Sequence, residues 1–382
     1  MVSNERGPLV GVLGSYGGRN LGDEAILTSL LADLRARRPD ARILVFSRDP
    51  DHTVRAHPGI EAVGWKGPGR GRTTAGMDRL DLLVLGGGGI LYDTEARHYL
   101  RLVRAAQEQA VPVFVHALGA GPLTEETDRA MVREALASTV DVTVRDAASR
   151  AVLKEVGVTQ RVTVTADPAL LLEPEIFPIE SLRAEGVPPG PRLIGVSVRE
   201  PGPAAEHLDV GGYHQFLAQL GDALVPRFDA RLLFVPMERT DIRHAQTVRS
   251  QMAAGEHCRI LSGDCRPRQV LGLMRHLDLA VGMRLHFLMF AALAGIPLLP
   301  LPYAGKVLDF AQRAGAPALR GAASDLVGPL LAEADRLGDV GTARTRQPAG
   351  RIAALRQRAA RTGEHLGAVL DQVCPAPLAR AG

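Results

Sequence analysis

Short runs of Val, Leu and Ile alternate along the chain with glycine-rich turns and amphipathic helical stretches. In the first half these runs occupy residues 9–16, 41–47, 81–87, 111–121, 141–146 and 161–169. In the second half they occupy residues 192–200, 231–237, 258–263, 277–283 and 297–303. Continuous apolar runs that alternate with helices are typical of strands in a parallel sheet that helices cover on both faces. The pattern therefore predicts an α/β fold.

A segment rich in Pro and Glu at residues 172–192 interrupts this alternation, as a linker does. The chain has 382 residues, which is enough for two domains. We therefore expect two Rossmann-like, doubly wound domains facing a cleft, at residues 1–175 and 190–345. Residues 346–374 have apolar side chains at helical spacing and are expected to form a C-terminal helix. Ligands of such sheets bind beyond the carboxyl ends of the strands, so the loops there are where a site is expected.

Charge and hydropathy exclude several classes of protein. Lys and Arg number 45 against 42 Asp and Glu, and like charges do not cluster into long runs, so we expect no nucleic-acid partner. The N-terminus is polar, and Gly or Pro interrupts the most apolar stretches, which argues against a signal peptide and a membrane span. Cys258, Cys265 and Cys374 lack CxxC spacing, and the His residues are scattered, so we expect reduced thiols and no metal site. We expect a cytoplasmic protein, and association with the inner face of the membrane or with further copies of the chain stays open.

The loop after the first apolar run, at residues 14–26, combines glycines with polar side chains. It lacks the GxGxxG and GK[ST] patterns of nucleotide-binding loops. Asn20, Asp23 and Glu24 instead offer acceptors for sugar hydroxyl groups. An equally simple interpretation is that Asp23 caps the helix that follows.

Two more strand-end segments in the first half could contact a ligand. Four consecutive glycines at residues 86–89 include Gly87 and Gly88, where a backbone can approach a phosphate or diphosphate closely. A tight turn explains the same glycines equally well. His116 is expected at or near a strand end, where a packed, hydrogen-bonded histidine is the simpler interpretation.

In the second half, Arg199 follows one apolar run, and Arg284 and His286 stand where another turns into an apolar helix. A helix N-terminus carries partial positive charge, and the planar guanidinium of arginine suits carboxylate and phosphate. Polar groups at the mouth of an apolar segment are costly unless something satisfies them. This arrangement predicts a site for a small anion, with His286 able to move a proton near neutral pH.

Six motifs taken in order over residues 11–310 resemble the polysaccharide pyruvyl transferase family. They are GSYGGRNLGDEAILTSLL, LGGGGIL, GAGPL, TVRDAASRAVLKEVGV, TADPALLL and GMRLHFLMFAALAGIP. The resemblance implies a fold similar to the two-domain GT-B glycosyltransferases. It also implies transfer of a pyruvyl group from phosphoenolpyruvate to two sugar hydroxyls as a cyclic ketal, in cell-wall or exopolysaccharide biosynthesis.

Carried over to this chain, the Arg-Leu-His motif of the family falls on Arg284, Leu285 and His286. A further donor-binding arginine falls most plausibly on Arg199. The chain keeps Tyr303 and Lys306 after its last apolar run but has Ala-Gly between them, where the family pattern has Asp-Pro.

The resemblance implies that phosphoenolpyruvate binds the second domain as a donor substrate, without a cofactor or metal. Its carboxylate and phosphate call for cationic partners, which Arg199 and Arg284 could supply, and His286 could serve as both acid and base. Leu285 and Lys306 are expected to line this site. The acceptor, a lipid-linked sugar or polysaccharide repeat, is expected on the first domain, at Asn20, Asp23, Glu24, Gly87, Gly88 and His116.

Two other functions stay open from the sequence. A GT-B glycosyltransferase that uses a nucleotide sugar would need a carboxylate for the base or ribose, and Glu238 could provide it. A protein that binds a sugar or phosphate in its cleft without turnover is the second alternative, because a fold does not fix a function.

Overall fold

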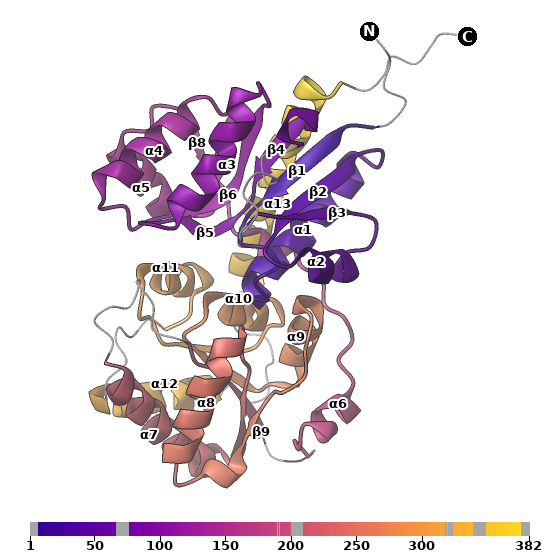
Figure 1. Cartoon of the computed structure of the whole chain (residues 1–382). Helices are drawn as coiled ribbons and strands as arrows, with labels where there is room; N and C mark the ends of the chain where they lie inside the picture. Colours follow the sequence, from indigo (N-terminus) through magenta and orange to yellow (C-terminus); the bar gives the residue numbers. More distant parts are fainter. Residues whose placement is uncertain are drawn as a thin grey trace. The chain divides into compact units, whose positions relative to one another are not determined.

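The computed structural model describes residues 7–65, 76–188, 190, 192–199, 209–317, 319, 324–338 and 349–375. The chain divides into two compact units (Figure 1). The first contains Met1–Leu172 together with Arg356–Gly382, and the second contains Glu173–Leu355. The division between Leu172 and Glu173 lies within the segment rich in Pro and Glu.

The first unit is built on a parallel sheet in the order β3-β2-β1-β4-β6-β7-β8, with β5 paired to β6. Its strands are β1 (Leu9–Leu13), β2 (Arg42–Ser47), β3 (Glu61–Gly64), β4 (Leu82–Leu85), β5 (Gly88–Leu91), β6 (Val113–Ala120), β7 (Asp141–Val144) and β8 (Val162–Val164). After β3 the chain returns to the other side of β1. The topological switch point of this sheet therefore lies between β1 and β4, where doubly wound sheets bind ligands.

Helices that follow the strands bury their apolar faces on this sheet. They are α1 (Leu21–Arg37), α2 (Pro50–Ala56), α3 (Ala96–Glu108), α4 (Glu126–Ala137) and α5 (Ala147–Val156). One hydrophobic cluster joins the side chains of β1, β4, β6 and β7 to those of α3, α4 and α5. The last helix, α13 (Ala349–Val373), returns to this unit, with the Thr362 hydroxyl 2.6 Å from that of Thr165 and His365 Nδ1 2.5 Å from Asp141 Oδ2.

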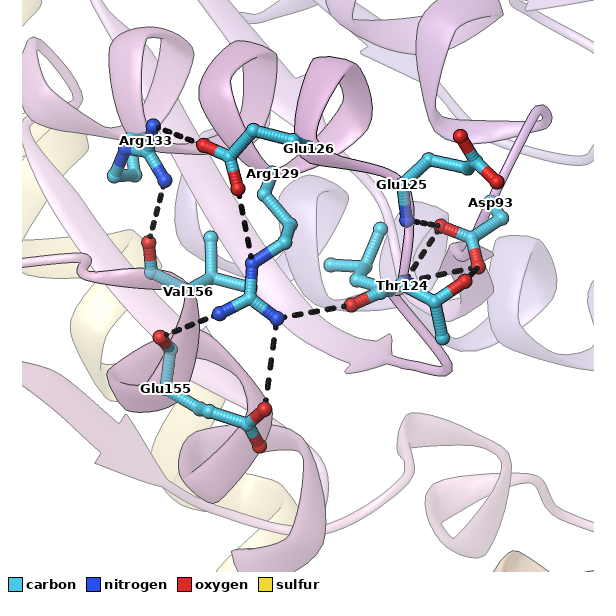
Figure 2. A network of polar contacts seen from close by, with 9 residues as sticks. Asp93, Thr124, Glu125, Glu126, Arg129, Arg133, Glu155 and Val156 are labelled. Atoms are coloured by element: carbon cyan, nitrogen blue, oxygen red, sulfur yellow. Dashed lines mark hydrogen bonds and ion pairs between the residues drawn. The ribbon is translucent and has the colours of Figure 1, made fainter.

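Polar contacts fix the segment between β6 and α4 (Figure 2). The Asp93 carboxylate accepts hydrogen bonds from the backbone N–H of Thr124 at 2.9 Å and from its hydroxyl at 2.7 Å. Arg129 and Arg133 on α4 donate to the last carbonyl groups of α5, at Glu155 (2.9 Å) and Val156 (3.1 Å). Because cations at the C-terminal end of a helix are stabilising, these arginines hold α4 against α5.

The second unit has a parallel sheet in the order β11-β10-β9-β12-β13. Its strands are β9 (Arg192–Ser197), β10 (Ala230–Phe234), β11 (Cys258–Ile260), β12 (Leu279–Gly282) and β13 (Leu298–Pro300). Its helices are α6 (Ile179–Ala184), α7 (Val210–Phe228), α8 (Arg239–Gln251), α9 (Pro267–Leu273), α10 (Leu285–Leu293), α11 (Gly305–Ala314) and α12 (Val327–Gly338). The switch point of this sheet lies between β9 and β12.

These two units confirm the predicted α/β fold with two Rossmann-like domains. The segment expected to be a linker contains the short helix α6. Helix α1 begins at Leu21, because Asn20 and not Asp23 caps it. Among the described residues, no helix is both long and apolar enough to cross a bilayer.

Candidate functional site

The predicted site residues lie mainly in loops at the two switch points. In the first unit, the segment at residues 14–20 follows β1 and Gly86–Gly87 follows β4. In the second unit, Arg199 follows β9 and Arg284 follows β12. Each pair of loops leaves neighbouring parallel strands at the carboxyl edge of its sheet, so each sheet presents one candidate site.

Arg284 is the residue that caps α10, and two carboxylates of the β10–α8 segment hold its guanidinium. Its Nε donates to Oδ2 of Asp241 at 3.0 Å, and its Nη2 donates to Oδ1 of the same carboxylate. Nη2 also lies 2.7 Å from Glu238 Oε1. The Asp241 side chain is fully buried, and it accepts a hydrogen bond from the Met237 backbone N–H at 3.0 Å. The orientation of Arg284 is thus fixed from the side of α8.

The same contacts set the charge of this part of the site. Burial acts against the charged form, but Asp241 and Glu238 overcome it and raise the pKa of Arg284, so the guanidinium is always protonated. Its positive charge is matched by two negative ones. Among the described residues, Nη1 of Arg284 makes no hydrogen bond, so a ligand can bind that nitrogen or compete with Glu238 for Nη2.

Arg199 contacts two tyrosines, Tyr303 and Tyr213. Its Nη1 donates to the Tyr303 hydroxyl, and its guanidinium carbon lies 4.5 Å from the centre of the Tyr303 ring. Its backbone carbonyl accepts a hydrogen bond from the Tyr213 hydroxyl at 2.6 Å. Burial, and then Asp241, raise the pKa of Tyr213, whereas Arg199 and Arg284 lower it. The Tyr213 phenol therefore lies within the electrostatic field of both arginines.

The remaining predicted donor-site residues occupy two helix starts. Leu285 is buried, and His286 is partly exposed, in the first turn of α10. Lys306 is exposed in the first turn of α11, three residues after Tyr303. The backbone N–H of Arg284 donates to the Ser197 hydroxyl at 3.3 Å, which joins the start of α10 to the end of β9.

Sequence reasoning missed Asp241 and Tyr213, and it assigned Glu238 only to a rival function. Glu238 and Asp241 follow β10, the neighbour of β9, so the rule that ligands bind at strand ends could have pointed to them. A buried pair of His214 and His244, with ring nitrogens 2.8 Å apart, lies next to Tyr213 and was also missed. Its members are on α7 and α8, where the sequence carries no motif.

In the first unit, Asn20 and Asp23 have separate roles at the start of α1. The Asn20 side chain accepts hydrogen bonds from the backbone N–H groups of Gly22 (3.0 Å) and Asp23 (3.4 Å). The interpretation of Asp23 as the cap is therefore wrong. Asp23 is half-buried and points to β5, because a Cβ atom at Gly88 would lie 3.2 Å from its Oδ1. Gly88 has φ +101°, which favours glycine at this position.

Glu24 is buried beneath the loop after β1. Its Oε1 accepts a hydrogen bond from the Gly17 backbone N–H at 2.9 Å, and its Oε2 makes no hydrogen bond among the described residues. Burial raises the pKa of Glu24 to about 7, against the hydrogen bond from Gly17, which lowers it. The carboxyl group is thus balanced between its two protonation states near neutral pH, and it ties the loop to α1.

The four glycines have a packing role that the phosphate interpretation did not include. The Tyr16 ring is fully buried beside Gly86, where a Cβ atom would lie 1.9 Å from the Tyr16 hydroxyl oxygen. Gly87 and Gly88 are buried, and only Gly89 of the four is exposed. The close approach at Gly86 is therefore to a tyrosine of the chain itself.

His116, expected at or near a strand end, lies inside β6, four residues before its end at Ala120. It is 3% exposed, and burial lowers its pKa to about 4. The imidazole is neutral at physiological pH.

The Glu24 carboxyl group should make stability depend on pH. Because its pKa is raised from 4.5 to about 7 in the folded chain, the folded state binds more protons than the unfolded state in that range. Stability should therefore fall as the pH rises from about 4.5 to about 7, by about 3 kcal/mol for this group.

Glu24→Gln should remove this component, which denaturant unfolding of parent and variant at pH values on either side of the range would measure. Glu134→Gln, at an exposed position on α4, is the control. A difference between Glu24→Gln and the parent that is the same at both pH values would contradict the assignment.

No His, Cys, Asp and Glu side chains among the described residues group into a cluster that could hold a metal ion. The polar side chains around Arg284 are instead a second arginine, two carboxylates and two tyrosine phenols. Such a set can bind an anion through hydrogen bonds and orient it for proton transfer by an imidazole.

Comparison with solved structures shows the fold. The Staphylococcus aureus protein MnaA in complex with UDP has a TM-score of 0.66 and 10% identity, over 97% of this chain and 98% of that one. The Anabaena protein HepE in complex with UDP and glucose has a TM-score of 0.63 and 14% identity, over 96% and 100%. The UDP-GlcNAc 2-epimerase from Methanocaldococcus jannaschii has a TM-score of 0.63 and 11% identity, over 94% and 99%. At these identities the similarity establishes a GT-B fold and not an activity.

Comparison at the level of sequence families is more specific. No curated protein sequence matches the chain. The family model of polysaccharide pyruvyl transferase matches residues 20–305, from the cap of α1 to the first residue of α11. That range includes Asn20, Arg199 and the Arg284–His286 motif. The chain is therefore a member of the polysaccharide pyruvyl transferase family.

Proposed function

We propose that this protein transfers a pyruvyl group from phosphoenolpyruvate to two hydroxyl groups of a sugar, forming a ketal. The main observation is the sequence Arg284-Leu285-His286 at the start of α10, next to Arg199, in a chain whose family is established. It puts fixed positive charge and an imidazole at one strand-to-helix turn.

On the donor side, we assign the anionic groups of phosphoenolpyruvate to Arg199, to Nη1 of Arg284 and to the N-terminal end of α10. Arginine suits these groups because its guanidinium is always charged and donates hydrogen bonds in a planar fork. Asp241 keeps the Arg284 fork in one orientation, so the ligand does not have to order it. Lys306 and Leu285 complete this side in our assignment.

The reaction balances without a cofactor. The methylene carbon of phosphoenolpyruvate gains a proton and becomes a methyl group, and one sugar hydroxyl adds to the neighbouring carbon with loss of its proton. The bond from that carbon to the phosphate oxygen then breaks, and the electron pair leaves with phosphate. A second hydroxyl adds to the same carbon and loses its proton, so one proton goes to carbon and one to phosphate. His286 is assigned to carry the first proton and to accept one from a hydroxyl.

On the acceptor side, we propose a lipid-linked sugar or a polysaccharide repeat, bound to the first unit at Asn20 and Asp23. The family supports a sugar acceptor in general. Glu24, Gly87 and Gly88 are buried and His116 lies inside the sheet, so we assign these four to support of the loops. We place the reaction in the cytoplasm, where phosphoenolpyruvate is available, on an acceptor carried at the inner face of the membrane.

A nucleotide-sugar glycosyltransferase is the main rival, since two of the similar structures contain UDP. That function would need Glu238 to bind a ribose or base. In this structure the Glu238 carboxylate is already held by Arg284, which argues against its use for a ribose or base. Incubation with phosphoenolpyruvate and methyl glycosides separates the two functions. Release of phosphate, together with a glycoside whose mass has increased by one pyruvyl group, supports pyruvyl transfer. In a parallel incubation with a UDP-sugar, release of UDP would support the rival if phosphoenolpyruvate gave no pyruvylated product.

Glu238→Gln should strengthen binding of the donor. The change removes one of the two negative charges beside Arg284, and a multiply charged anion then meets less repulsion and a more available Nη2. We expect the KM for phosphoenolpyruvate to fall by about threefold to tenfold, the range for loss of one partly exposed charge contact.

Glu256→Gln is the matched control for this prediction, because Glu256 is a highly exposed carboxylate of the same unit. It should leave the KM unchanged. An unchanged or higher KM in Glu238→Gln, with the fold intact by circular dichroism, would show that Glu238 and the donor do not compete for Arg284.

A further inference from the structure

Aromatic side chains with hydrogen-bonding groups gather at the carboxyl edge of the first sheet. The chain has one Trp and five Tyr. Four of these six belong to this region: Tyr16 after β1, Trp65 after β3, Tyr92 after β5, and Tyr99 in the first turn of α3. The Trp65 and Tyr99 rings have centres 5.0 Å apart, and both are buried. Trp65 and Tyr99 belong to the hydrophobic core of this unit, whereas Tyr92 is only half-buried.

Arg48, the first residue after β2, lies on this aromatic group. Its Nη2 donates to the Tyr99 hydroxyl at 3.2 Å, and its guanidinium carbon is 5.9 Å from the centre of the Trp65 ring. Its backbone N–H donates to the Tyr16 carbonyl at 3.0 Å, which fixes it beside the loop after β1. One third of its side chain remains exposed, at 33%. Arg48 thus has a fixed base and a guanidinium that solvent can reach.

Tyr92 and two carboxylates complete the group. Tyr92 is half-buried, and its pKa is raised to about 12 by burial and then by Glu95 and Tyr99. Arg48 and Asp23 also act on the phenol, so the charges of Asp23, Glu95 and Arg48 all lie near it. Arg48 Nη2 is 3.9 Å from Glu95 Oε2, and the Glu95 side chain is 25% exposed.

We propose that Asp23, Arg48, Tyr92 and Glu95 form the subsite that binds the pyranose ring of the acceptor sugar. A pyranose presents an apolar C–H face that packs on an aromatic ring, and hydroxyls at its rim that bond to carboxylates and guanidinium groups. These four residues include two carboxylates, Asp23 and Glu95, and one cation, Arg48, so the subsite suits hydroxyl groups better than phosphate. In identifying the sugar as the acceptor, the inference rests on the proposed function; as a sugar-binding site it does not.

The single tryptophan gives a direct measurement of this binding. Trp65 is in contact with Tyr99 and Arg48, so its fluorescence should change when a sugar binds. The full chain, without phosphoenolpyruvate, is titrated with the methyl glycosides of glucose, galactose and N-acetylglucosamine. We expect a saturable change with at least one of them. Absence of a saturable change with all three would overturn the proposal, as would a saturable change with inorganic pyrophosphate alone.

Variants assign the change to the subsite. Tyr92→Ala and Arg48→Met should each weaken the binding by about tenfold or more, since each loses a ring contact or a charged hydrogen bond. Tyr92→Phe keeps the ring and should bind within a few-fold of the parent, and Arg48→Lys provides a second variant if Arg48→Met does not fold. Arg19→Met is the matched control, because Arg19 is in the neighbouring loop between β1 and α1 but pairs with Asp49. Unchanged binding in folded Arg48 and Tyr92 variants would overturn the proposal.

A parallel assay of pyruvyl transfer separates this inference from the proposed function. Sugar binding that depends on Arg48 and Tyr92, in a protein that releases no phosphate from phosphoenolpyruvate, would leave the subsite standing and reject the proposed function. Pyruvyl transfer with an acceptor KM that is unchanged in Arg48→Met and Tyr92→Ala would support the proposed function and reject the subsite.

Discussion

His286→Ala should reduce kcat for pyruvyl transfer by about a hundredfold to ten-thousandfold, the usual contribution of a positioned acid or base. Binding of phosphoenolpyruvate should stay within a few-fold of the parent. Asp241 fixes Arg284 whether or not the imidazole is present. Removal of the His286 side chain should therefore leave the contacts of Arg284 with the anion in place. Single-turnover kinetics, together with donor binding measured by calorimetry, would show both effects.

Two further variants make this result specific. His257→Ala removes an exposed histidine of the same unit and should leave kcat unchanged. Added imidazole should restore part of the activity of His286→Ala, because the cavity left by the side chain can admit the missing base. Full activity in His286→Ala would remove the imidazole from the mechanism. A loss of donor binding as large as the loss of kcat would make His286 a binding residue and not the proton carrier.

Arg284→Met should destabilise the second unit by about 3–5 kcal/mol, because it leaves the fully buried Asp241 carboxylate without its partner. It should also abolish saturable donor binding. Arg284→Lys keeps the charge but loses the paired hydrogen bonds to Asp241, so we expect a smaller loss of stability and a higher KM for phosphoenolpyruvate. Chemical denaturation and donor titration measure the two effects.

A double-mutant cycle isolates the pair. In Arg284→Met/Asp241→Leu, no unpaired buried charge remains at these positions, so the double variant should be less destabilised than the sum of the single changes, by about 1–3 kcal/mol. The pair of Arg227 and Asp335 is the matched control. It is also doubly bonded but more exposed, at 51% and 30%, and Arg227→Met should cost under about 1 kcal/mol. Equal losses for Arg284→Met and Arg227→Met would show that burial does not govern the Arg284 contact.

The fold was largely predictable because its signal is local. Each apolar run that was expected to be a strand overlaps one, and their alternation with helices was enough to predict parallel sheets. The helix starts were predicted less well. Asn20 and Asp23 are both good caps by residue type, and the choice between them depends on backbone angles that the sequence does not display.

The candidate site was predictable only where a motif carried it. The Arg284–His286 motif could be placed at a strand-to-helix turn from periodicity alone. The strand-end rule could have pointed to Glu238 and Asp241, but not to their contact with Arg284, because Asp241 reaches Arg284 across 43 positions of sequence through strand order and helix packing. The glycine run was misleading in part for the same reason, since the tyrosine that needs Gly86 comes from a different loop.

The measurement that tests the central claim most directly is the origin of the hydrogens in the product. Transfer is run in deuterium oxide with phosphoenolpyruvate and the methyl glycoside that is turned over, and the product is examined by mass spectrometry and NMR. We predict one phosphate released for each ketal formed, and one solvent deuteron in the methyl group of that ketal. A product that retains the carbon–carbon double bond of phosphoenolpyruvate, or a methyl group without deuterium, would contradict the account.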